Sequence, residues 1–306
     1  MNEVLLGPAD PDYFRVRVGY ERWYTDPLPG CDIAEASDAN YPSISRVKKA
    51  ASSDWSFVTM RRIANASDND LRTLAELDPT RRLGALKLIN NHGLSIDAGR
   101  GTIVHWWGED LLNGRPMREI TMLMLADHGI PAEALEIAEL YKDALRDFFD
   151  AYKPRLYATE YVVIHRSLNG VGYGGTPDGL WWLDDPPAPY KPGLYAFDYK
   201  TRSPVSRHGA YPEEAAQVAA GAFADYMIVR GPHGEAVRQR IPELQGGMIV
   251  SIRPDGARVY PIDLEAAWAD WQERHRWYLS RQKEKEGIGR VWPTRRAPKE
   301  IGRAHV

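Results

Sequence analysis

The sequence of 306 residues contains one cysteine, Cys31. A single cysteine cannot close a disulfide within the chain, and it cannot supply the roughly four thiolates that hold an iron–sulfur cluster. We therefore expect a reducing compartment and no iron–sulfur cluster. Long apolar runs are missing too, since none approaches the roughly 18–20 residues needed to span a bilayer. The N-terminal segment lacks a basic stretch followed by an apolar run, so we predict no secretion signal, no membrane partner and a cytoplasmic location.

A strong excess of charge of one sign is also absent. The 39 Lys and Arg residues nearly balance the 42 Asp and Glu residues, which gives a net charge of −3. This balance argues against a generally basic coat for nucleic acid, so any contact with DNA needs a local patch or metal ions that offset phosphate charge. One local candidate is the segment 287–306, whose five basic residues and one glutamate give +4 (5 − 1). We interpret it as a phosphate-contacting arm or as a solvated, frayed tail.

Apolar residues recur at helical spacing between residues 69 and 150. We predict one short helix that stops at Gly93, another that opens at Gly101, and a longer one that starts at Pro131. The buried stripe of the longer helix is expected to consist of Leu135, Ile137, Leu140, Tyr141, Ala144, Leu145 and Phe148.

From Pro154 onward, short β-branched and aromatic runs alternate with turn signals such as Asn169-Gly170. The order of elements indicates an α/β (α+β) fold, in which a mixed β-sheet is flanked by helices and preceded by a helical N-terminal region. The expected elements are strand 156–165, strand 171–183 with a bend at Gly174-Gly175, strand 194–201, helix 212–228, strands 247–252 and 257–262, and a helix from Asp263 to Lys285 with the inward stripe Trp268, Trp271, His275 and Tyr278. Ser43 or Ser45 is a candidate N-cap near the start.

Two charged groups lie on neighbouring strands of this expected sheet. Asp178 follows Pro177 at a strand bend, and Asp198-Tyr199-Lys200 comes twenty residues later (198 − 178). Because side chains alternate along a strand, Asp198 and Lys200 share one face and Tyr199 has the other. An antiparallel pairing of the strands would bring Asp178 to the same end as Asp198. Two carboxylates and an ammonium then converge, which is typical of a site for a hard divalent cation with a charged helper for water or phosphate.

Simpler interpretations of the same residues remain open. Asp178 can be a turn aspartate, a residue type favoured in turns for its local backbone hydrogen bonds. Asp198 and Lys200 can form an ion pair on an exposed face. The apolar neighbours of Asp198 favour burial, and a buried charge is costly without a partner or a metal. Glu160, in the strand before the Asn-Gly turn, either faces the same site or lies exposed.

The pattern Pro-Asp, spacer, Asp-x-Lys resembles the PD-(D/E)XK nuclease superfamily. A helical histidine upstream, His105, and a glutamine after the Asp-x-Lys strand, Gln217, resemble its RecB-type exonuclease branch, which includes phage-borne relatives of the CRISPR-adaptation exonucleases. The resemblance covers about Ser43 to Tyr278, and its specific part is Glu160 to Gln217. It implies a restriction-endonuclease-like nuclease core over residues 154–286, an N-terminal region over residues 1–153 that contributes His105, and a basic tail over residues 287–306.

The resemblance implies a DNA exonuclease that depends on Mg²⁺ or Mn²⁺, acts on linear single- or double-stranded DNA, and serves recombination or repair in a bacterial or phage-infected cell. The pattern GxxxxGK[ST] is absent, so any ATP-driven unwinding would come from a helicase or recombination partner. The alternatives are a site-specific endonuclease of the same fold, a catalytically inactive DNA-binding relative, and a metal hydrolase that does not act on nucleic acid.

Each residue of the expected site has a hypothetical role. Oxygen ligands suit Mg²⁺ and Mn²⁺, so the metal would be bound by Asp178, Asp198 and the backbone carbonyl of Tyr199. The resemblance implies His105 as a further ligand and Gln217 as a residue that positions the DNA strand. Lys200 would orient or help deprotonate the attacking water, and Glu160 would be a secondary ligand or hold a water.

The sequence departs from the RecB-type branch in two ways. The iron–sulfur cysteines are missing, and the pattern QxxxY has Gly221 in place of its tyrosine, with Tyr226 the nearest tyrosine.

Four tryptophans are candidates for stacking on single-stranded bases, although core packing is the preferred interpretation; they are Trp106, Trp107, Trp181 and Trp182. Trp181 and Trp182 are adjacent on a strand, so at most one of them can face DNA.

Overall fold

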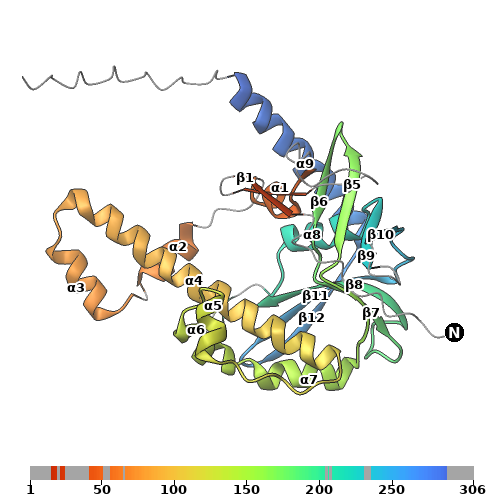
Figure 1. Ribbon diagram of the computed structural model, residues 1–306, viewed down its shortest axis with the longest axis horizontal. Coiled ribbons are helices and arrows are strands. Elements are labelled where there is room, and N and C mark those ends of the chain that lie inside the picture. The colour runs from red at the N-terminus through yellow and green to blue at the C-terminus, as the bar shows by residue number, and fades with distance from the viewer. Residues whose placement is uncertain are drawn as a thin grey trace, which may run out of the picture.

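The computed structural model describes residues 15–18, 21–24, 41–50, 56–64, 66–203, 206, 209–230 and 236–287 (Figure 1). Cys31 and the basic segment after residue 287 lie outside them. The helices are α1 (Ile44–Ala50), α2 (Ser56–Ala64), α3 (Asp68–Glu76), α4 (Pro79–Leu112), α5 (Met122–Asp127), α6 (Ala132–Glu139), α7 (Lys142–Tyr152), α8 (Pro212–Ala222) and α9 (Leu264–Gly287). The strands are β1 (Arg15–Val18), β2 (Glu21–Tyr24), β3 (Tyr41–Pro42), β4 (Arg155–Thr159), β5 (Val162–Leu168), β6 (Val171–Gly175), β7 (Gly179–Leu183), β8 (Gly193–Thr201), β9 (Tyr226–Arg230), β10 (Ala236–Gln239), β11 (Gly246–Arg253) and β12 (Gly256–Ile262).

The centre of the fold is a five-stranded mixed sheet in the order β12–β11–β8–β7–β4. Strand β11 runs parallel to β8, whereas the other neighbouring strands are antiparallel. A second sheet has the order β10–β9–β5–β6. Helices α2 to α7 precede these sheets in the chain. The predicted α+β class, with a mixed sheet, flanking helices and a helical N-terminal region, is confirmed. None of the helices in the described part of the chain combines the length and apolar content needed to cross a membrane.

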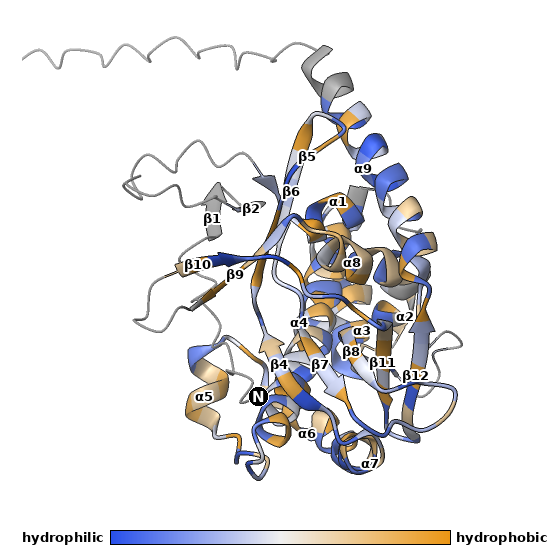
Figure 2. Cartoon of the chain, turned by 90° about the vertical axis from the view of Figure 1, so that its right-hand side faces the viewer, coloured by the Kyte–Doolittle hydropathy of each residue, from blue (hydrophilic) through white to orange (hydrophobic). Residues whose placement is uncertain are grey.

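Side chains of the central strand β8 alternate between two cores. Phe197 and Tyr199 pack with residues of α4, α6 and α7, whereas Leu194 and Ala196 pack with residues of α1, α8 and α9. Strand β11 beside it is buried along nearly its whole length, and its apolar residues are orange in Figure 2. Because Asp198 has the same parity as Ala196, its side chain is directed toward α8 rather than α4.

The strands that enclose the expected site differ from the prediction. The sequence predicts continuous strands over 156–165 and 171–183, but each is interrupted and its two halves belong to different sheets. The first interruption falls at Glu160, which has a left-handed backbone with φ of 44°. The second spans residues 176–178, so the chain bends there and not at Gly174-Gly175, which lie inside β6. The chain thus passes from one sheet to the other twice, between β4 and β5 and between β6 and β7. Asp178 lies at this joint between the two sheets.

Helix α4 also differs from the prediction, because it runs through Gly93 and Gly101 without a break. Asp78 caps its N-terminus by accepting a hydrogen bond from the Thr80 N–H at 2.9 Å. Its buried residues all lie between Gly99 and Asp110, so its first half projects from the body with α3 (Figure 1). His105 therefore lies deep inside a long helix rather than one turn from a helix start.

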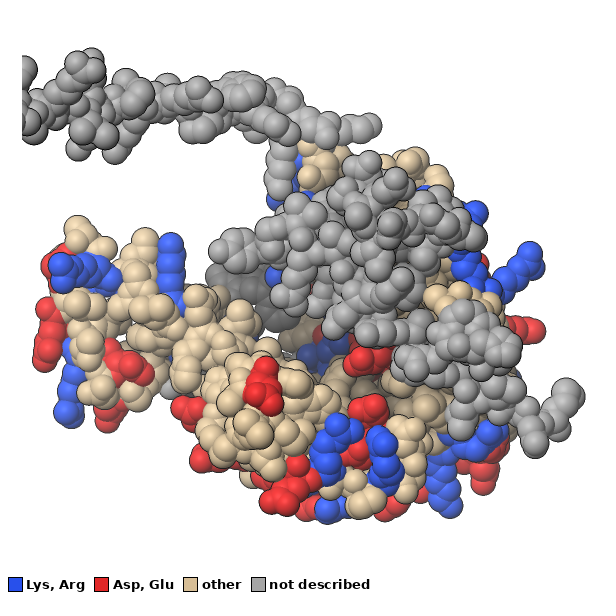
Figure 3. Space-filling model, in the orientation of Figure 1, with Lys and Arg blue, Asp and Glu red and all other residues tan. Residues whose placement is uncertain are grey.

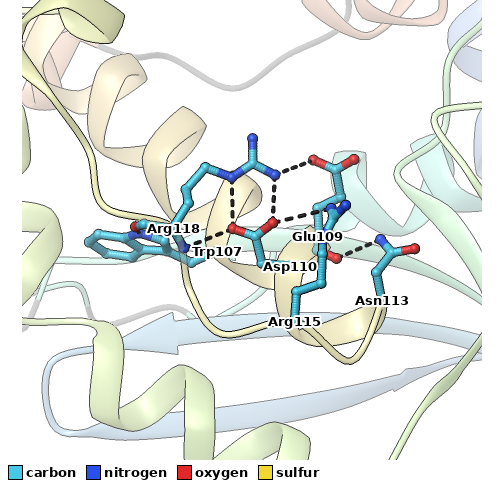
Figure 4. A network of polar contacts seen from close by, with 6 residues as sticks. All are labelled: Trp107, Glu109, Asp110, Asn113, Arg115 and Arg118. Atoms are coloured by element: carbon cyan, nitrogen blue, oxygen red, sulfur yellow. Dashed lines mark hydrogen bonds and ion pairs between the residues drawn. The ribbon is translucent and has the colours of Figure 1, made fainter.

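A cluster of charged side chains closes the end of α4 (Figure 4). Arg118 donates to both carboxylate oxygens of the buried Asp110, at 2.7 Å each, and its own N–H donates to the same group at 2.9 Å. The Arg118 side-chain hydrogen bond holds the pKa of Asp110 below its ordinary value, although burial opposes this. The Arg118 carbonyl accepts from the Trp107 indole at 3.1 Å. This cluster fixes the turn of α4 that carries His105.

Other element boundaries were predicted with mixed success. The helix expected from Pro131 is interrupted after Glu139, which leaves Leu140 of the predicted buried stripe 61% exposed. The helix expected over 212–228 ends at Ala222, and its last residues form strand β9 instead. The N-cap predictions are confirmed for Ser43, which accepts from the Arg46 N–H at 3.2 Å, and for Asp263, which accepts from the Ala266 N–H at 3.1 Å. The inward stripe of α9 is confirmed, with Trp271, His275 and Tyr278 buried and Trp268 partly buried.

Candidate active site

Asp178 is held at the joint between the two sheets by contacts with both neighbouring strands. Its carbonyl accepts hydrogen bonds from the Glu160 N–H and the Thr159 hydroxyl, each at 3.1 Å. Its side-chain Oδ2 accepts from the Tyr199 N–H at 2.8 Å. The antiparallel pairing of the two strands on which the expected convergence depends is present, since Gly179 lies opposite Phe197. This register brings the Asp178 carboxylate against the peptide bond that joins Asp198 to Tyr199.

Asp198 and Lys200 form an ion pair in a buried setting. The Lys200 Nζ contacts Asp198 Oδ2 and also donates to the Tyr199 carbonyl at 3.1 Å. The Asp198 side chain is 4% exposed and that of Lys200 is 20% exposed, so the interpretation as an ion pair on an exposed face does not hold. The pair instead closes the inner end of the site.

Burial and neighbouring charges displace the pKa values of both members of this pair. Burial raises the pKa of Asp198 to about 6; Lys200 opposes the shift and Asp178 adds to it. Burial lowers the pKa of Lys200, but the carboxylates of Asp198 and Asp178 outweigh burial and the net pKa lies above the ordinary value. Lys200 is therefore held as an ammonium. Burial disfavours the ionised form of Asp198, so any further cation beside this carboxylate would stabilise it.

Gln217 reaches Asp198 from helix α8. Its Nε2 donates to Asp198 Oδ1 at 3.3 Å, and its Oε1 accepts from the Lys48 ammonium of α1 at 2.6 Å. Burial and then the charge of Lys200 lower the pKa of Lys48. Sequence reasoning assigned no role to Lys48, because its contact with Gln217 joins residues 169 positions apart. The only local signal is its place after Val47, a fully buried residue of the same short helix.

A second buried pair holds α8 against the end of β8. The Arg202 guanidinium contacts the Glu214 carboxylate and lies 5.1 Å above the centre of the Tyr211 ring. Glu214 Oε2 accepts from the Tyr211 N–H at 3.0 Å, which caps the start of α8. These residues were not predicted as part of the site. By fixing the first turn of α8, they place Gln217 one turn later over Asp198.

His105 and Glu160 border the site less closely. The His105 Nε2 lies 3.9 Å from Asp178 Oδ2, and its side chain is 35% exposed. Its ring meets Tyr199 edge to face at 5.5 Å. Glu160 donates its backbone N–H to the Asp178 carbonyl, while its side chain is exposed, in agreement with one of its two open interpretations. The structure thus brings Gln217 and His105 to one region around Asp178, Asp198 and Lys200, whereas Glu160 contacts this region through its backbone N–H.

The donor types at this centre suit a hard cation. Two carboxylates and the Tyr199 carbonyl supply oxygen, and His105 supplies nitrogen at the rim. Over the described ranges, no group of three or more His, Cys, Asp and Glu side chains is close enough to hold a metal ion by itself. Within the site, the Lys200 ammonium takes the position beside Asp198 where a positive charge is needed. A metal there would depend on the backbone carbonyl and water to complete its ligands.

The departure at Gly221 has a steric reason. A Cβ atom at this position would lie 2.8 Å from Cγ of Pro177, the residue before Asp178. A tyrosine therefore cannot occupy position 221 without displacing the bend that carries Asp178. Tyr226 does not replace it on the helix, because it begins strand β9 and is buried there.

The surface near the site carries mixed charge. Figure 3 shows acidic and basic side chains at the bottom of a hollow beside the projecting half of α4. Trp107 and Trp181 are fully buried, and Trp181 stacks on Phe197, so core packing is correct for both. Trp106 and Trp182 are partly exposed.

Comparison with known proteins adds little to this geometry. No protein-family profile matches the chain, and no curated protein matches it. A solved structure described as "Crystal structure of SSO0001" is 12% identical, with the likeness covering 59% of this chain and 74% of that chain at a TM-score of 0.29. A likeness at this level supports no conclusion on fold or function.

Proposed function

We propose that this protein is a deoxyribonuclease that depends on Mg²⁺ or Mn²⁺ and hydrolyses phosphodiester bonds, as in the RecB-type branch of the PD-(D/E)XK superfamily. The observation that carries the proposal is the convergence of Asp178, Asp198 and Lys200 at the joint of two sheets, with Gln217 bound to Asp198 from the next helix. Fold alone would not suffice for this conclusion, because function depends on the site.

The charge of each site residue indicates its role in the proposed reaction. Asp178, Asp198 and the Tyr199 carbonyl would hold the metal, with His105 as an outer ligand. A bound Mg²⁺ or Mn²⁺ supplies charge for the phosphate and lowers the pKa of a coordinated water. Lys200 is held protonated by its carboxylate neighbours, which favours donation to the attacking water or to the phosphate over proton abstraction. Glu160 would hold a water at the outer edge of the site.

The expected substrate is linear DNA, and the expected setting is recombination or repair in a bacterial or phage-infected cell. The net charge of −3 leaves little general attraction for DNA, so binding would rest on the metal and on local basic groups. A helicase or recombination partner would supply strand separation where this is needed.

The test compares end-labelled linear DNA with closed circular DNA, single- and double-stranded, in Mg²⁺, Mn²⁺ and EDTA. We expect metal-dependent loss of linear DNA only, reduced about 100-fold or more in Asp198→Ala and Lys200→Ala. Arg146→Ala serves as the control, since Arg146 is exposed on α7 and pairs with the exposed Asp143 one turn away.

Three outcomes would change the proposal. Cleavage of the circle would indicate an endonuclease of the same fold. Full activity in a folded Asp198→Ala or Lys200→Ala variant would show that the site is wrongly assigned. DNA binding without cleavage under any condition would indicate a binding protein with an inactive site.

A further inference from the structure

Lys48 of helix α1 brings an ammonium to the site from the N-terminal part of the chain. Helix α1 is anchored by Ser43, whose carbonyl accepts from the Arg46 and Val47 N–H groups at 2.9 and 3.1 Å. Val47 is fully buried, and Lys48 follows it. The Lys48 Nζ lies 2.6 Å from Gln217 Oε1. A rigid helix start and a short contact therefore fix where this charge lies.

The contact determines which way the Gln217 amide points. An ammonium can only donate hydrogen bonds, so the amide atom that faces Lys48 must be the oxygen. The amide nitrogen is then directed to the opposite side, where it donates to Asp198 Oδ1 at 3.3 Å. If the amide turned over, its oxygen would face a carboxylate oxygen, and two acceptors would repel each other. Lys48 thus selects the orientation in which Gln217 supports Asp198.

Asp198 is consequently held at both oxygens. Oδ1 accepts from Gln217, and Oδ2 contacts the Lys200 ammonium. These two contacts fix the plane of the carboxylate relative to the Tyr199 carbonyl and to Asp178. A carboxylate whose plane is fixed binds a cation at lower entropic cost than one that rotates, and partners of ligands commonly contribute to metal affinity in this way.

We propose that Lys48 is a positioning residue that acts through Gln217 to orient Asp198 for binding a divalent cation. This inference rests on the proposed function for its relevance to cleavage, but its first readout is metal binding without DNA. The competing role, in which Lys48 contacts the phosphate of DNA directly, predicts no effect on metal binding.

The experiment is a double-mutant cycle with Lys48→Met, Gln217→Leu and the double variant, each titrated with Mn²⁺ in a calorimeter and then assayed for cleavage. Methionine has a length similar to that of lysine, so it keeps the apolar contacts of α1. We expect Lys48→Met to weaken Mn²⁺ binding about 10-fold, the lower end of the range for residues that support metal ligands. The double variant should bind no more weakly than Gln217→Leu alone, because the hydrogen-bonded route from Lys48 to Asp198 passes through the amide.

Two control variants separate this role from simple stabilisation. Lys48→Arg keeps a donor-only group and should recover part of the lost Mn²⁺ affinity. Lys49→Met changes the next, exposed lysine of the same helix and should leave Mn²⁺ binding unchanged. A loss that is the same in all three lysine variants would reflect a weakened α1 and would overturn the proposal.

The remaining outcomes are also decisive. Unchanged Mn²⁺ binding in Lys48→Met, or losses that multiply in the double variant, would overturn the role through Gln217. A wild-type protein that binds Mn²⁺ with the expected coupling but cleaves no DNA would refute the proposed nuclease function while supporting the positioning role. A wild-type protein that binds no Mn²⁺ would overturn both.

Discussion

Gly221 lies on α8 directly against Pro177, so the helix and the bend that carries Asp178 are in contact without an intervening side chain. Helix α8 and Pro177 can approach this closely because Gly221 has no Cβ atom. At the residue scale, the position of Asp178 depends on a group that does not contact it.

We predict that Gly221→Ala lowers DNA cleavage about 10- to 100-fold with the fold retained, because the new methyl group must shift Pro177 and with it Asp178, and small misplacements of this kind are costly. Cleavage rates and circular dichroism would check this. Gly84→Ala is the matched control, since nothing lies within 4 Å of a Cβ at that position. Equal cleavage by Gly221→Ala and wild type would mean that the bend does not set the site.

At the scale of elements, α4 consists of two halves with different surroundings. Its first half has no buried residues and carries Leu83 and Leu88 at 61% and 71% exposure. Its second half packs on the central sheet and on α6. One continuous helix thus joins an exposed arm to the turn that carries His105.

We predict opposite effects of the same substitution in these two halves. Gly84→Ala should stabilise the arm by about 0.5–1 kcal/mol, because alanine loses less backbone entropy in an exposed helix. Gly99→Ala should destabilise the protein by about 1–3 kcal/mol, because its Cβ would lie 2.6 Å from Ile130 Cγ2. Hydrogen exchange of α4 amides measures the first effect and denaturant unfolding the second. An arm that exchanges equally fast in both proteins would contradict the first expectation.

The contacts within and between elements explain which parts of the site could be predicted from the sequence. Strand alternation was sufficient to place Asp198 and Lys200 on one face and to bring Asp178 beside them, because these relations are local to one strand pair. The change of sheet at Glu160 has no local signal, since the strand pattern continues across it, whereas Pro177-Asp178-Gly179 signals a bend but not a change of sheet. Gly101 suggests a helix start, yet in the structure it lies inside the continuous helix α4. Lys48 became visible only through a contact between distant segments.

At the scale of the whole molecule, helix α9 packs on the second sheet through a buried histidine. His275 is fully buried, and its ring lies edge to face with Tyr173 of β6 at 6.0 Å. Burial is the main cause that lowers its pKa to about 4. The packing of His275 against this sheet therefore favours the neutral imidazole.

We predict that the contribution of His275 to the free energy of unfolding falls as the pH is lowered from about 6.5 toward 4, since the unfolded state gains a proton at this residue in that range and the folded state does not. The loss attributable to His275 is at most about 3 kcal/mol, and it levels off below the folded pKa. Denaturant unfolding in EDTA at several pH values measures it.

Asp198 contributes with the opposite sign, because a carboxyl whose folded pKa is raised to about 6 loses stability as the pH rises. His275→Gln isolates the histidine, because only the difference between wild type and variant is compared. If both proteins show the same pH dependence, the histidine does not control the attachment of α9.

The contact between Lys48 and Gln217 also has a consequence in time. A ribosome adds about 5–20 residues per second, and the two residues are 169 positions apart, so α8 emerges roughly ten to thirty seconds after α1. Asp178 and Asp198 are made within that interval. A chain still being synthesised therefore carries the carboxylates before it carries the amide that orients them, and the proposed nuclease would remain incompletely assembled while its own messenger RNA and template DNA are close by.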